Sequence, residues 1–480
     1  MSIIIPANSA VGGGFEVANS IMLQDSRLFK TPSSSGSQRK FTFSAWVKKS
    51  DFSSGVVFSS GEADGNPNFA LYFASGDKLN LYSSQGMEYT TNALFLDPGA
   101  WMHIVISVNT ASSNASNRQL IWVNGVQQTS FSTSNPIAQN TDLSINTSAY
   151  RMAVGTGVDN QDYFGGYVAE VVFLDNQALG HLSFGEFDSD SGIWKPIAIT
   201  GSAATPGTNG FYLNFQDSSN LGNDEFGGTD LSVSDIVARD QVTDTCTNNF
   251  ATLNPIDFAR WQNNTPEAVL ANGALQTGIG SSEKVLLRST IGVKTGKWYW
   301  EAKSDGVSKM FFGVCNLKCG TDANAPHSSS DYVGVYYYEA TPYYAYYSGA
   351  GNPTNGIASI SSGDILNFAL DCDNQTFYIG KNGTYMNSGN PASGATGTGS
   401  INRLWNYASS LFAVDGVPTE MFASCYVSST SGSGTAQYNF GNPTFTGTDK
   451  SDDNDRGSFE YQPPAGYLAL CTANISETNS

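Results

Sequence analysis

The feature that most constrains this chain is a recurring alternation of apolar and polar residues in runs too short to be helices. Residues 363–383, for example, read GDILNFALDCDNQTFYIGKNG, and the apolar residues of ILNFAL and TFYIG alternate between two faces. The polar DCDNQ between them supplies a tight turn, and the Asn-Gly pair at 382–383 is a strong hairpin signal because both residues accept positive φ. The segment therefore predicts an antiparallel meander that serves as scaffold, so function has to be sought on the loops around it.

The same pattern of short alternating runs extends over the whole chain. Runs such as FTFSAWVKKS, WMHIVISVN and FGGYVAEVVFLD occur in the first half, and KWYWEAKS, MFFGVCN and AQYNFG resume it after about residue 285. Neither coiled-coil heptads nor a regular solenoid repeat is present in the sequence. Because 480 residues exceed one ordinary domain, we predict an all-β fold of two antiparallel β-sandwich domains of jelly-roll type in tandem.

The domain boundaries are predicted from shifts in composition. The stretch DIVARDQVTDTCTNNFATLNP is more charged than its surroundings and is broken by a proline, so the join is expected here. We expect an N-terminal arm over residues 1–25, a first sandwich over 26–240, a linker over 241–284 and a second sandwich over 285–480. A Gly/Ser-rich segment over 384–420 is expected to be an insertion in the second sandwich.

Charge and hydropathy exclude several classes of function. The net charge of −19 argues against nucleic acid as a partner, because a phosphate backbone requires a basic face. No apolar run is long enough for a membrane helix, and the N-terminus lacks the basic region of a signal peptide, so we expect no membrane insertion. Cys315-x-x-x-Cys319 has a spacing that could serve a metal, but no second pair of ligands accompanies it.

Four segments of the first half are similar to the laminin-G-like members of the concanavalin A-type jelly rolls. They are FTFSAWVKKS (41–50), WMHIVISVN (101–109), LIWVNGVQ (120–127) and FGGYVAEVVFLDNQAL (164–179). The resemblance implies a strand with an inward Trp, a strand opened by Trp, a strand ending in an Asn-Gly hairpin, and a return strand with an acid before an apolar run. It covers roughly residues 20–235.

The second half resembles SPRY domains. GKWYWEAK (296–303) is similar to the strand of that family that contains Tyr-Trp-Glu, and MFFGVCN (310–316) is similar to its next strand. Residues 363–383 resemble its meander, and AQYNFG (436–441) resembles its closing Asn-Phe-Gly. The resemblance covers about residues 285–445 and departs from the family at the insertion.

The chain as a whole resembles virion-associated proteins of tailed bacteriophages. LFKTPSSSGSQRKFTFSAWVKKS, SFGEFDSDSGIWKP, TNNFATLNP and PPAGYLALCTANI are segments that recur in such fibres, spikes and head appendages. The resemblance implies a structural protein made in the host cytoplasm and exposed on the virion, where residues 1–25 dock it to other virion proteins. Such proteins are symmetric homo-oligomers, most often trimers, and they bind a host-surface glycan or receptor. A decoration protein that contacts only other virion subunits is the structural alternative.

An acid cluster in SFGEFDSDSG provides the enzymatic alternative. Glu186, Asp188 and Asp190 alternate, as do the carboxylates of glucanases with a related jelly roll. A retaining glycosidase requires an acid and a nucleophile about 5–5.5 Å apart. However, the third position is Asp where those enzymes have Glu, and the glycines and serines favour a solvated loop. We therefore predict that the protein is not an enzyme, with a glycan depolymerase that uses Glu186 and Asp188 as the alternative.

Calcium is the one cofactor that the sequence suggests. NFQDSSNLGNDEFGG resembles the DSSGNGN stretch of laminin-G-like domains, and its hard oxygen ligands are Asp217, Asn220, Asn223 and Asp224. The alternative is a loop of Asx turns, in which these side chains bond to their own backbone.

Partner contacts are predicted at tyrosines and at the insertion. Alternation in YYYEATPYYAYYS turns some tyrosines outward, where they suit stacking on sugar rings or packing on a neighbouring subunit. The insertion adds an aromatic group in a variable loop, although self-packing is the simpler reading. The predicted contact residues are Tyr337, Tyr338, Tyr343, Tyr344, Tyr346, Arg403, Trp405 and Tyr407.

Overall fold

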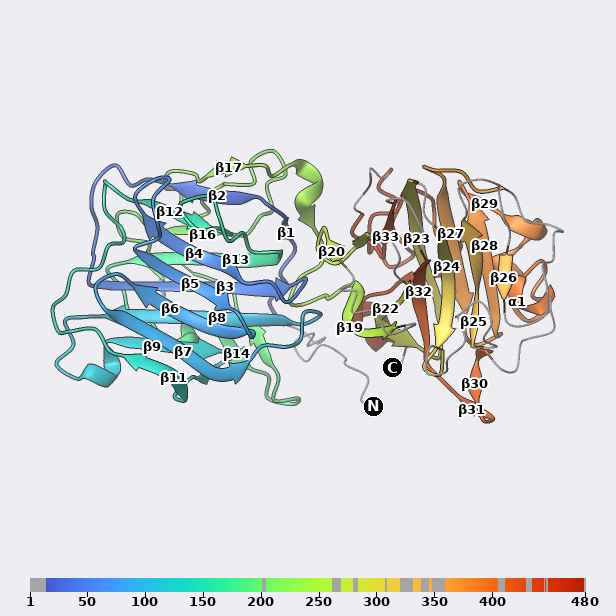
Figure 1. The fold of residues 1–480 in the computed structure, drawn as a ribbon, viewed down its shortest axis with the longest axis horizontal. Coiled ribbons are helices and arrows are strands. Elements are labelled where there is room, and N and C mark those ends of the chain that lie inside the picture. The colour runs from blue at the N-terminus through green and yellow to red at the C-terminus, as the bar shows by residue number, and fades with distance from the viewer. Residues whose placement is uncertain are drawn as a thin grey trace. The chain divides into compact units, whose positions relative to one another are not determined.

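The structure is a computed structural model. It describes residues 14–200, 204–260, 269–278, 284–306, 309–319, 331–337, 345–347, 359–404, 411–428, 434–443, 445 and 448–478. Strands dominate these ranges, and the α-helices described are the short α1 (Ile401–Leu404) and α3 (Thr472–Thr478). The predicted all-β fold class is therefore confirmed (Figure 1). None of the described helices is long and apolar enough to cross a membrane.

The chain forms two compact units, a first unit over residues 6–249 and a second unit over residues 250–480. The first unit contains two eight-stranded sheets, named here after a central strand. In spatial order, the β3 sheet consists of β10 (Val126–Gln127), β9 (Gln119–Val123), β8 (Trp101–Asn109), β3 (Lys40–Lys49), β13 (Gly166–Asp175), β1 (Ser20–Leu23) and β18 (Gln241–Val242), with β16 (Phe211–Leu213) beside β13. The β5 sheet consists of β11 (Phe131–Asn135), β7 (Met87–Leu94), β6 (Lys78–Ser83), β5 (Phe69–Ala74), β4 (Gly55–Gly61), β12 (Arg151–Val154), β2 (Arg27–Lys30) and β17 (Ser232–Ser234).

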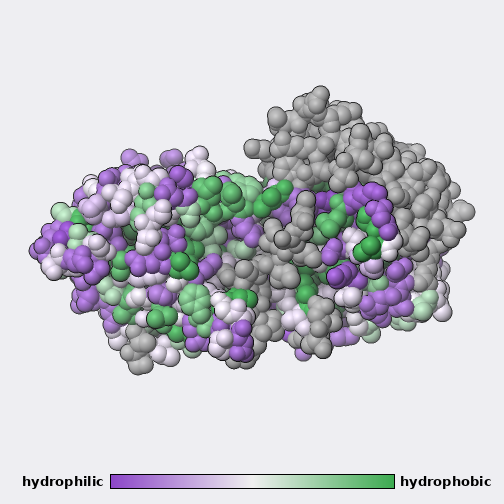
Figure 2. All heavy atoms as spheres, turned by 90° about the horizontal axis from the view of Figure 1, so that it is seen from below, coloured by the Kyte–Doolittle hydropathy of each residue, from purple (hydrophilic) through white to green (hydrophobic). Residues whose placement is uncertain are grey.

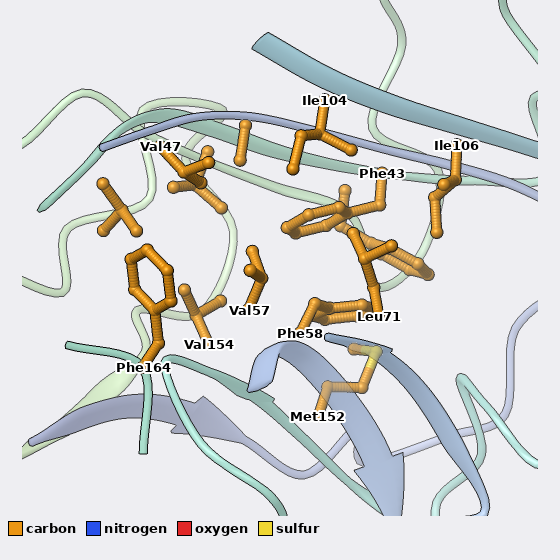
Figure 3. Packing of buried hydrophobic residues seen from close by; sticks show 14 of the residues in the cluster. Phe43, Val47, Val57, Phe58, Leu71, Ile104, Ile106, Met152, Val154 and Phe164 are labelled. Carbon is orange, nitrogen blue, oxygen red and sulfur yellow. The ribbon is translucent and has the colours of Figure 1, made fainter. Parts of the chain in front are cut away.

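Alternation along the strands builds the core of the first unit between these sheets. Phe43 and Val47 on β3 point toward Phe58 and Leu71 on the β5 sheet (Figure 3), and the rings of Phe43 and Phe58 stack with centroids 4.4 Å apart. Each such side chain contributes about 1.5–3 kcal/mol when it is fully buried. The four segments similar to laminin-G-like domains form β3, β8, β9 with β10, and β13, and the Asn-Gly hairpin lies between β9 and β10 as expected.

The side of the β3 sheet that faces away from this core, called its outer face, is also covered. Trp46, which the resemblance placed inward, is buried, but it lies on the outer face with Trp101 and Trp194. Its neighbours Ala45 and Val47 fill the core instead. This difference arises because the chain after β13 folds back over the sheet through η2 (His181–Ser183), β14 (Gly185–Phe187) and β15 (Trp194–Pro196).

The second unit also contains two large sheets. The six-stranded β24 sheet consists, in spatial order, of β19 (Leu253–Arg260), β22 (Lys284–Val293), β32 (Met421–Ser428), β24 (Lys309–Asn316), β25 (Tyr332–Tyr337) and β26 (Ala345–Tyr347). The eight-stranded β23 sheet consists of β20 (Val269–Ala271), β21 (Gln276–Gly278), β33 (Gly434–Asn439), β23 (Lys297–Gly306), β27 (Ile365–Asp371), β28 (Thr376–Lys381) and β29 (Thr384–Tyr385), with β34 (Leu468–Ala469) parallel to β23.

The predicted meander over residues 363–383 is confirmed as β27 and β28. Leu366, Phe368 and Phe377 point into the core of the second unit. The turns before and after β28 take positive φ values, 52° at Gln375 and 50° at Asn382. The opposite face is buried as well, because the C-terminal segment packs over it.

The predicted boundary segments contain regular structure. The end of the arm over residues 1–25 forms β1, whereas residues 1–13 lie outside the described ranges. Residues 241–284 contain β18 in the first unit and β19 to β21 in the second. The insertion over 384–420 contains β29, α1, the short hairpin of β30 (Ala413–Val414) and β31 (Val417–Pro418), and the 3-10 turns η5 (Met386–Ser388) and η6 (Pro391–Thr396).

Candidate functional site

The hairpin of β14 and β15, on the outer face of the β3 sheet, is the best-defined candidate site. Its cross-strand pairs are Phe187 with Trp194 and Glu186 with Lys195. Because successive residues of a strand face opposite sides, the two aromatic residues share one side of the hairpin and the charged pair lies on the other. The aromatic side rests on the β9–β10 turn, where a Cβ added to Gly125 would meet both rings within 3 Å.

Trp194 is anchored by a buried histidine. The Nε1 of Trp194 donates to Nδ1 of His103 over 3.0 Å, and Nε2 of His103 lies 2.8 Å from Oγ of Ser44. Because an indole N–H can only donate, Nδ1 is unprotonated, and Nε2 carries the proton that Ser44 accepts. Burial lowers the pKa of His103 to about 3, and the nearby His181 lowers it further. The Ser44–His103 pair therefore has no free basic nitrogen for nucleophilic catalysis.

An aromatic group extends from this anchor to the edge of the sheet. The ring of His103 stacks between Trp46 and Trp194, with centroids 4.8 and 5.9 Å away. His181 then bridges Trp194 and Trp122 with centroid distances of 5.4 and 5.3 Å. Packed aromatic rings of this kind hold the hairpin rigid.

The solvent end of this group is apolar. Phe187 is 48% exposed and packs edge-on against Trp194, with centroids 4.9 Å apart. Val126 on the edge strand β10 and Leu182 in η2 are also exposed. Val126, Leu182 and Phe187 are called the hairpin patch below. Figure 2 shows that hydrophobic side chains come to the surface of the first unit among hydrophilic ones.

On the charged side of the hairpin, one lysine forms ion pairs with two carboxylates. Nζ of Lys195 lies 3.4 Å from a carboxylate oxygen of Glu186 and 3.1 Å from one of Asp188. The other oxygen of Asp188 accepts from the backbone N–H groups of Asp190 and Ser191 and from the Ser191 hydroxyl. These hydrogen bonds, first from Ser191 and then from Lys195, hold the pKa of Asp188 well below its ordinary value.

This arrangement does not suit a glycosidase. A retaining enzyme requires one carboxyl group that is protonated at neutral pH and a cleft that receives the sugar. Asp188 is kept ionised, and Lys195 occupies the space between the two carboxylates. Glu186 lies on the short strand β14, whereas Asp188 and Asp190 follow in the turn, so the predicted solvated loop begins only after Phe187.

A second acid, Glu170, lies beneath the hairpin. It occupies a β-bulge in β13, where two residues oppose Ala45 of β3, and its φ is +50°. The extra residue keeps Val168 and Val171 in the core and turns Glu170 to the outer face. Its carboxylate accepts from the Tyr212 hydroxyl over 2.6 Å. The adjoining crevice, which Trp46, His103 and Phe184 help to line, has no room for a water molecule.

The ionisation of Glu170 predicts a pH dependence of stability. Burial raises its pKa to about 7, although the Tyr212 hydroxyl favours the ionised form. The folded state therefore holds a proton that the unfolded state has lost, so the contribution to stability is complete below pH ~4.5 and is lost as the pH rises through 7. We expect the free energy of unfolding of the first unit to fall by about 3 kcal/mol over this window, and Glu170→Gln to abolish the fall. Denaturant titrations of the wild type and the variant at a series of pH values measure the free energy of unfolding. The same pH dependence of this free energy in both proteins would contradict the prediction.

The predicted calcium ligands have separate partners. Asp217 caps a turn at Ser219, as the Asx-turn alternative expects, and Asn220 donates to Asp230. The Asn223 amide donates to Glu225. Among the described residues no group of three or more His, Cys, Asp or Glu is placed to hold a metal ion. Calcium binding in this loop stays a prediction.

Asp224 differs from the other predicted ligands because it is buried. Its Oδ1 accepts from the backbone of Tyr212 and Phe226, and its Oδ2 has no hydrogen-bond partner. Its described contacts therefore join the loop to the middle of β16.

The predicted tyrosine and insertion contacts fall where the structure gives no side-chain description. Tyr337, Tyr346 and Arg403 lie in described backbone, but their side chains are outside the described set. Residues 338, 343, 344, 405 and 407 lie outside it altogether, so these contacts also stay predictions.

Phe187, Leu182 and the Trp194 anchor were not among the predicted site residues. The signal was present in EFDSDSGIWKP, where two alternating runs flank an Asx-rich turn and place aromatic residues opposite each other. His103 and Trp194 are 91 positions apart, and this separation left their pairing unreadable from local pattern.

Comparison with known proteins agrees with the laminin-G-like assignment of the first unit. Residues 24–180 match the family model described as the Concanavalin A-like lectin/glucanases superfamily. A search of curated proteins found no match.

Several solved structures are similar to parts of the chain. The SPRY domain of human HERC1 is 19% identical and matches over 39% of this chain and 96% of its own length, with a TM-score of 0.27. A putative carbohydrate binding protein from Bacteroides ovatus is 13% identical, over 46% of this chain and 60% of its own, with a TM-score of 0.35. Domain 4 of the extracellular arabinanase AbnA from Geobacillus stearothermophilus was solved with arabinotriose. It is 20% identical and matches over 33% of this chain and 71% of its own length, with a TM-score of 0.24.

Proposed function

We propose that this chain is a non-enzymatic binding protein exposed on the virion of a tailed bacteriophage, as a tail fibre, spike or head fibre. In this proposal the hairpin patch of the first unit contacts a host-surface glycan. The observation that carries it is the exposed ring of Phe187, which is held against the buried Trp194. An exposed aromatic ring that is held in place is a surface on which a sugar ring can stack.

The rigidity of the hairpin supports binding rather than catalysis. Trp194 is fixed by His103, and the Lys195 ion pairs fix the polar side, so little conformational entropy is lost when a ligand binds. The superfamily that residues 24–180 match includes both lectins and glucanases. Because Asp188 is held ionised, the hairpin suits the binding role better.

The virion context rests on sequence resemblance. The segments SFGEFDSDSGIWKP and TNNFATLNP are similar to segments of phage appendage proteins, and the first of them contains the proposed binding hairpin. In this setting the chain assembles as a homo-oligomer, with a trimer favoured, and residues 1–25 contact other virion proteins.

The hairpin patch is tested by replacing Phe187 with alanine. We expect binding to host-envelope glycan to weaken by about five- to ten-fold, because the stacking surface is lost. Phe52→Ala is the matched control, since Phe52 is 40% exposed in the same unit but lies outside the patch. Binding is measured by surface plasmon resonance on immobilised host polysaccharide. Equal affinities for the two variants would contradict the assignment.

Two alternatives predict different results. A decoration protein would be found in purified particles but would show no binding to host cells or their glycans. A depolymerase would release new reducing ends from host polysaccharide, and Glu186→Gln would abolish the release. We expect binding without release, and antibody labelling of particles locates the chain on the head or the tail.

A further inference from the structure

The outer face of the β24 sheet, in the second unit, holds two cysteines in contact. Alternation along β24 turns Phe312 and Val314 into the core and Cys315 to the outer face. The turn after β24 then brings Cys319 into the same buried cluster. Both thiols are completely buried and free.

Polar side chains from three neighbouring strands surround Cys315. Arg288 on β22 is paired in register with Ser424 on β32, and Tyr332 on β25 is paired with Cys315. The Arg288 Nε, the Ser424 hydroxyl and the Tyr332 hydroxyl are all buried and have no oxygen or nitrogen hydrogen-bond partner. A buried donor without an acceptor costs about 1–3 kcal/mol, so three in one place require an explanation.

The sheet leaves room for these groups by means of paired glycines. Gly313 on β24 lies opposite Gly334 on β25, and a Cβ added to Gly334 would come 2.4 Å from the Tyr332 hydroxyl. The Tyr332 hydroxyl therefore lies over Gly334 of β25 rather than in solvent. An anionic sulfur at Cys315 would provide the acceptor that these donors lack.

The charge distribution favours that anion. Nη1 of Arg288 pairs with Asp257 over 2.6 Å, and Nη2 donates to the carbonyl of Cys319, so the guanidinium is held in place. Burial by itself raises the pKa of Cys315, but the Cys319 S–H, the Arg288 charge and the Ser424 hydroxyl together lower it below its ordinary value. The pKa of Cys319, which donates to Cys315, is raised.

We propose that Cys315 is a redox-active thiolate and that Cys319 resolves its oxidation to an intrachain disulfide. The oxidant is hydrogen peroxide. The Cys315 sulfur attacks one peroxide oxygen and the O–O bond breaks, so that a sulfenic acid forms and the departing hydroxide takes up a proton as water. The Cys319 sulfur then loses its proton and displaces hydroxide from Cys315, which forms the S–S bond and a second water. Two thiols thus supply the two electrons that reduce the peroxide.

The surroundings of the pair allow this chemistry. The turn that carries Cys319 includes the exposed Lys318 and the half-buried Leu317, so residues next to the thiols in the chain reach the surface. Peroxide is little larger than water and can enter beside such a turn during local opening. Cys372 and Cys425 in the same unit provide an internal comparison, because burial raises the pKa of both thiols.

The test is peroxide treatment of the full chain followed by mass spectrometry. We expect the loss of two hydrogens, a cross-linked peptide that joins Cys315 to Cys319, and oxidation at least ~10 times faster than at Cys372. Cys319→Ser should stop the reaction at the sulfenic acid, which dimedone labels at Cys315. Equal rates at Cys315 and Cys372, or oxidation that requires denaturant, would overturn the proposal.

The role of Arg288 is tested separately. Arg288→Gln should slow oxidation of Cys315 by about ten-fold or more, whereas Arg288→Lys, which keeps the charge, should retain part of the rate. If either variant fails to fold, ultraviolet absorbance of the thiolate provides a second readout. The wild-type chain should then show one thiolate near neutral pH that Cys315→Ser lacks, and its absence from the wild type would overturn the proposal.

Discussion

Lys48→Met is expected to lower the free energy of unfolding of the first unit by about 3–5 kcal/mol, because it leaves the carboxylate of Asp244 buried without its cation. Nζ of Lys48 lies 2.7 Å from Asp244 and 2.6 Å from the side-chain oxygen of Asn249. The other oxygen of Asp244 accepts from the indole of Trp101 over 2.9 Å. Both charged side chains are at most 1% exposed, so water cannot replace the lost partner.

This expectation is checked by hydrogen exchange of the amides of β3 and β8, which reports on the first unit alone. Arg39→Met is the control, because its ion pair with Asp142 is exposed and should leave the exchange unchanged. A double variant, Lys48→Met with Asp244→Leu, should recover much of the loss, because no charge is left buried. A single variant as stable as the wild type would contradict this role for the buried ion pair.

Glu301→Ala is expected to destabilise the second unit by about 3–5 kcal/mol. The Glu301 carboxylate is fully buried on β23 and accepts from the Tyr299 hydroxyl and the Asn439 amide. It also accepts from the backbone N–H groups of Glu460 and Tyr461, over 2.9 and 2.8 Å. Removing it takes the acceptor from four donors, although the Asn439 amide still donates to the Ser458 carbonyl. Two of the four donors lie on a C-terminal segment that has no strand partner at those positions among the described pairings.

The amides of Glu460 and Tyr461 provide the direct measurement. They should lose their protection from hydrogen exchange in Glu301→Ala, and β27 should lose protection to a smaller extent. Glu301→Gln should fall between the wild type and the alanine variant, because the neutral amide keeps one acceptor oxygen. Asp415→Asn, at an exposed turn, is the control and should have no effect. Unchanged protection of the two amides would refute this role for Glu301.

The sequence was sufficient to predict the strands, because the alternation that identifies a strand lies within a few neighbouring residues. Alternation within ten residues identified β3, β8, β13, β27 and β28, and the Asn-Gly pairs identified the turns. The face occupied by Trp46 could not be read in the same way. It depends on the hairpin of β14 and β15, which returns to cover a sheet surface that would otherwise be exposed.

The candidate sites depended on long-range contacts and were therefore harder to predict. Lys48 and Asp244 are separated by 196 positions, and no local pattern links them. The Cys315 site gathers side chains from four strands whose order in the sheet is not their order in the chain. By contrast, the turn contacts of Asp217 followed from the predicted Asx-turn alternative, which acts within three residues.

The pairing of β1 with β18 brings the first and last strands of the first unit to one sheet edge. Ser20 lies opposite Val242 and Ile21 opposite Gln241, and the Ser20 hydroxyl donates to the carbonyl of Asp244, just beyond the ladder. Because the Asp244 carboxylate is itself buried against Lys48 and Trp101, the end of the unit is fastened by this ion pair as well as by the two-residue ladder. We therefore expect fraying to start at the ends of the unit only after that ion pair is broken.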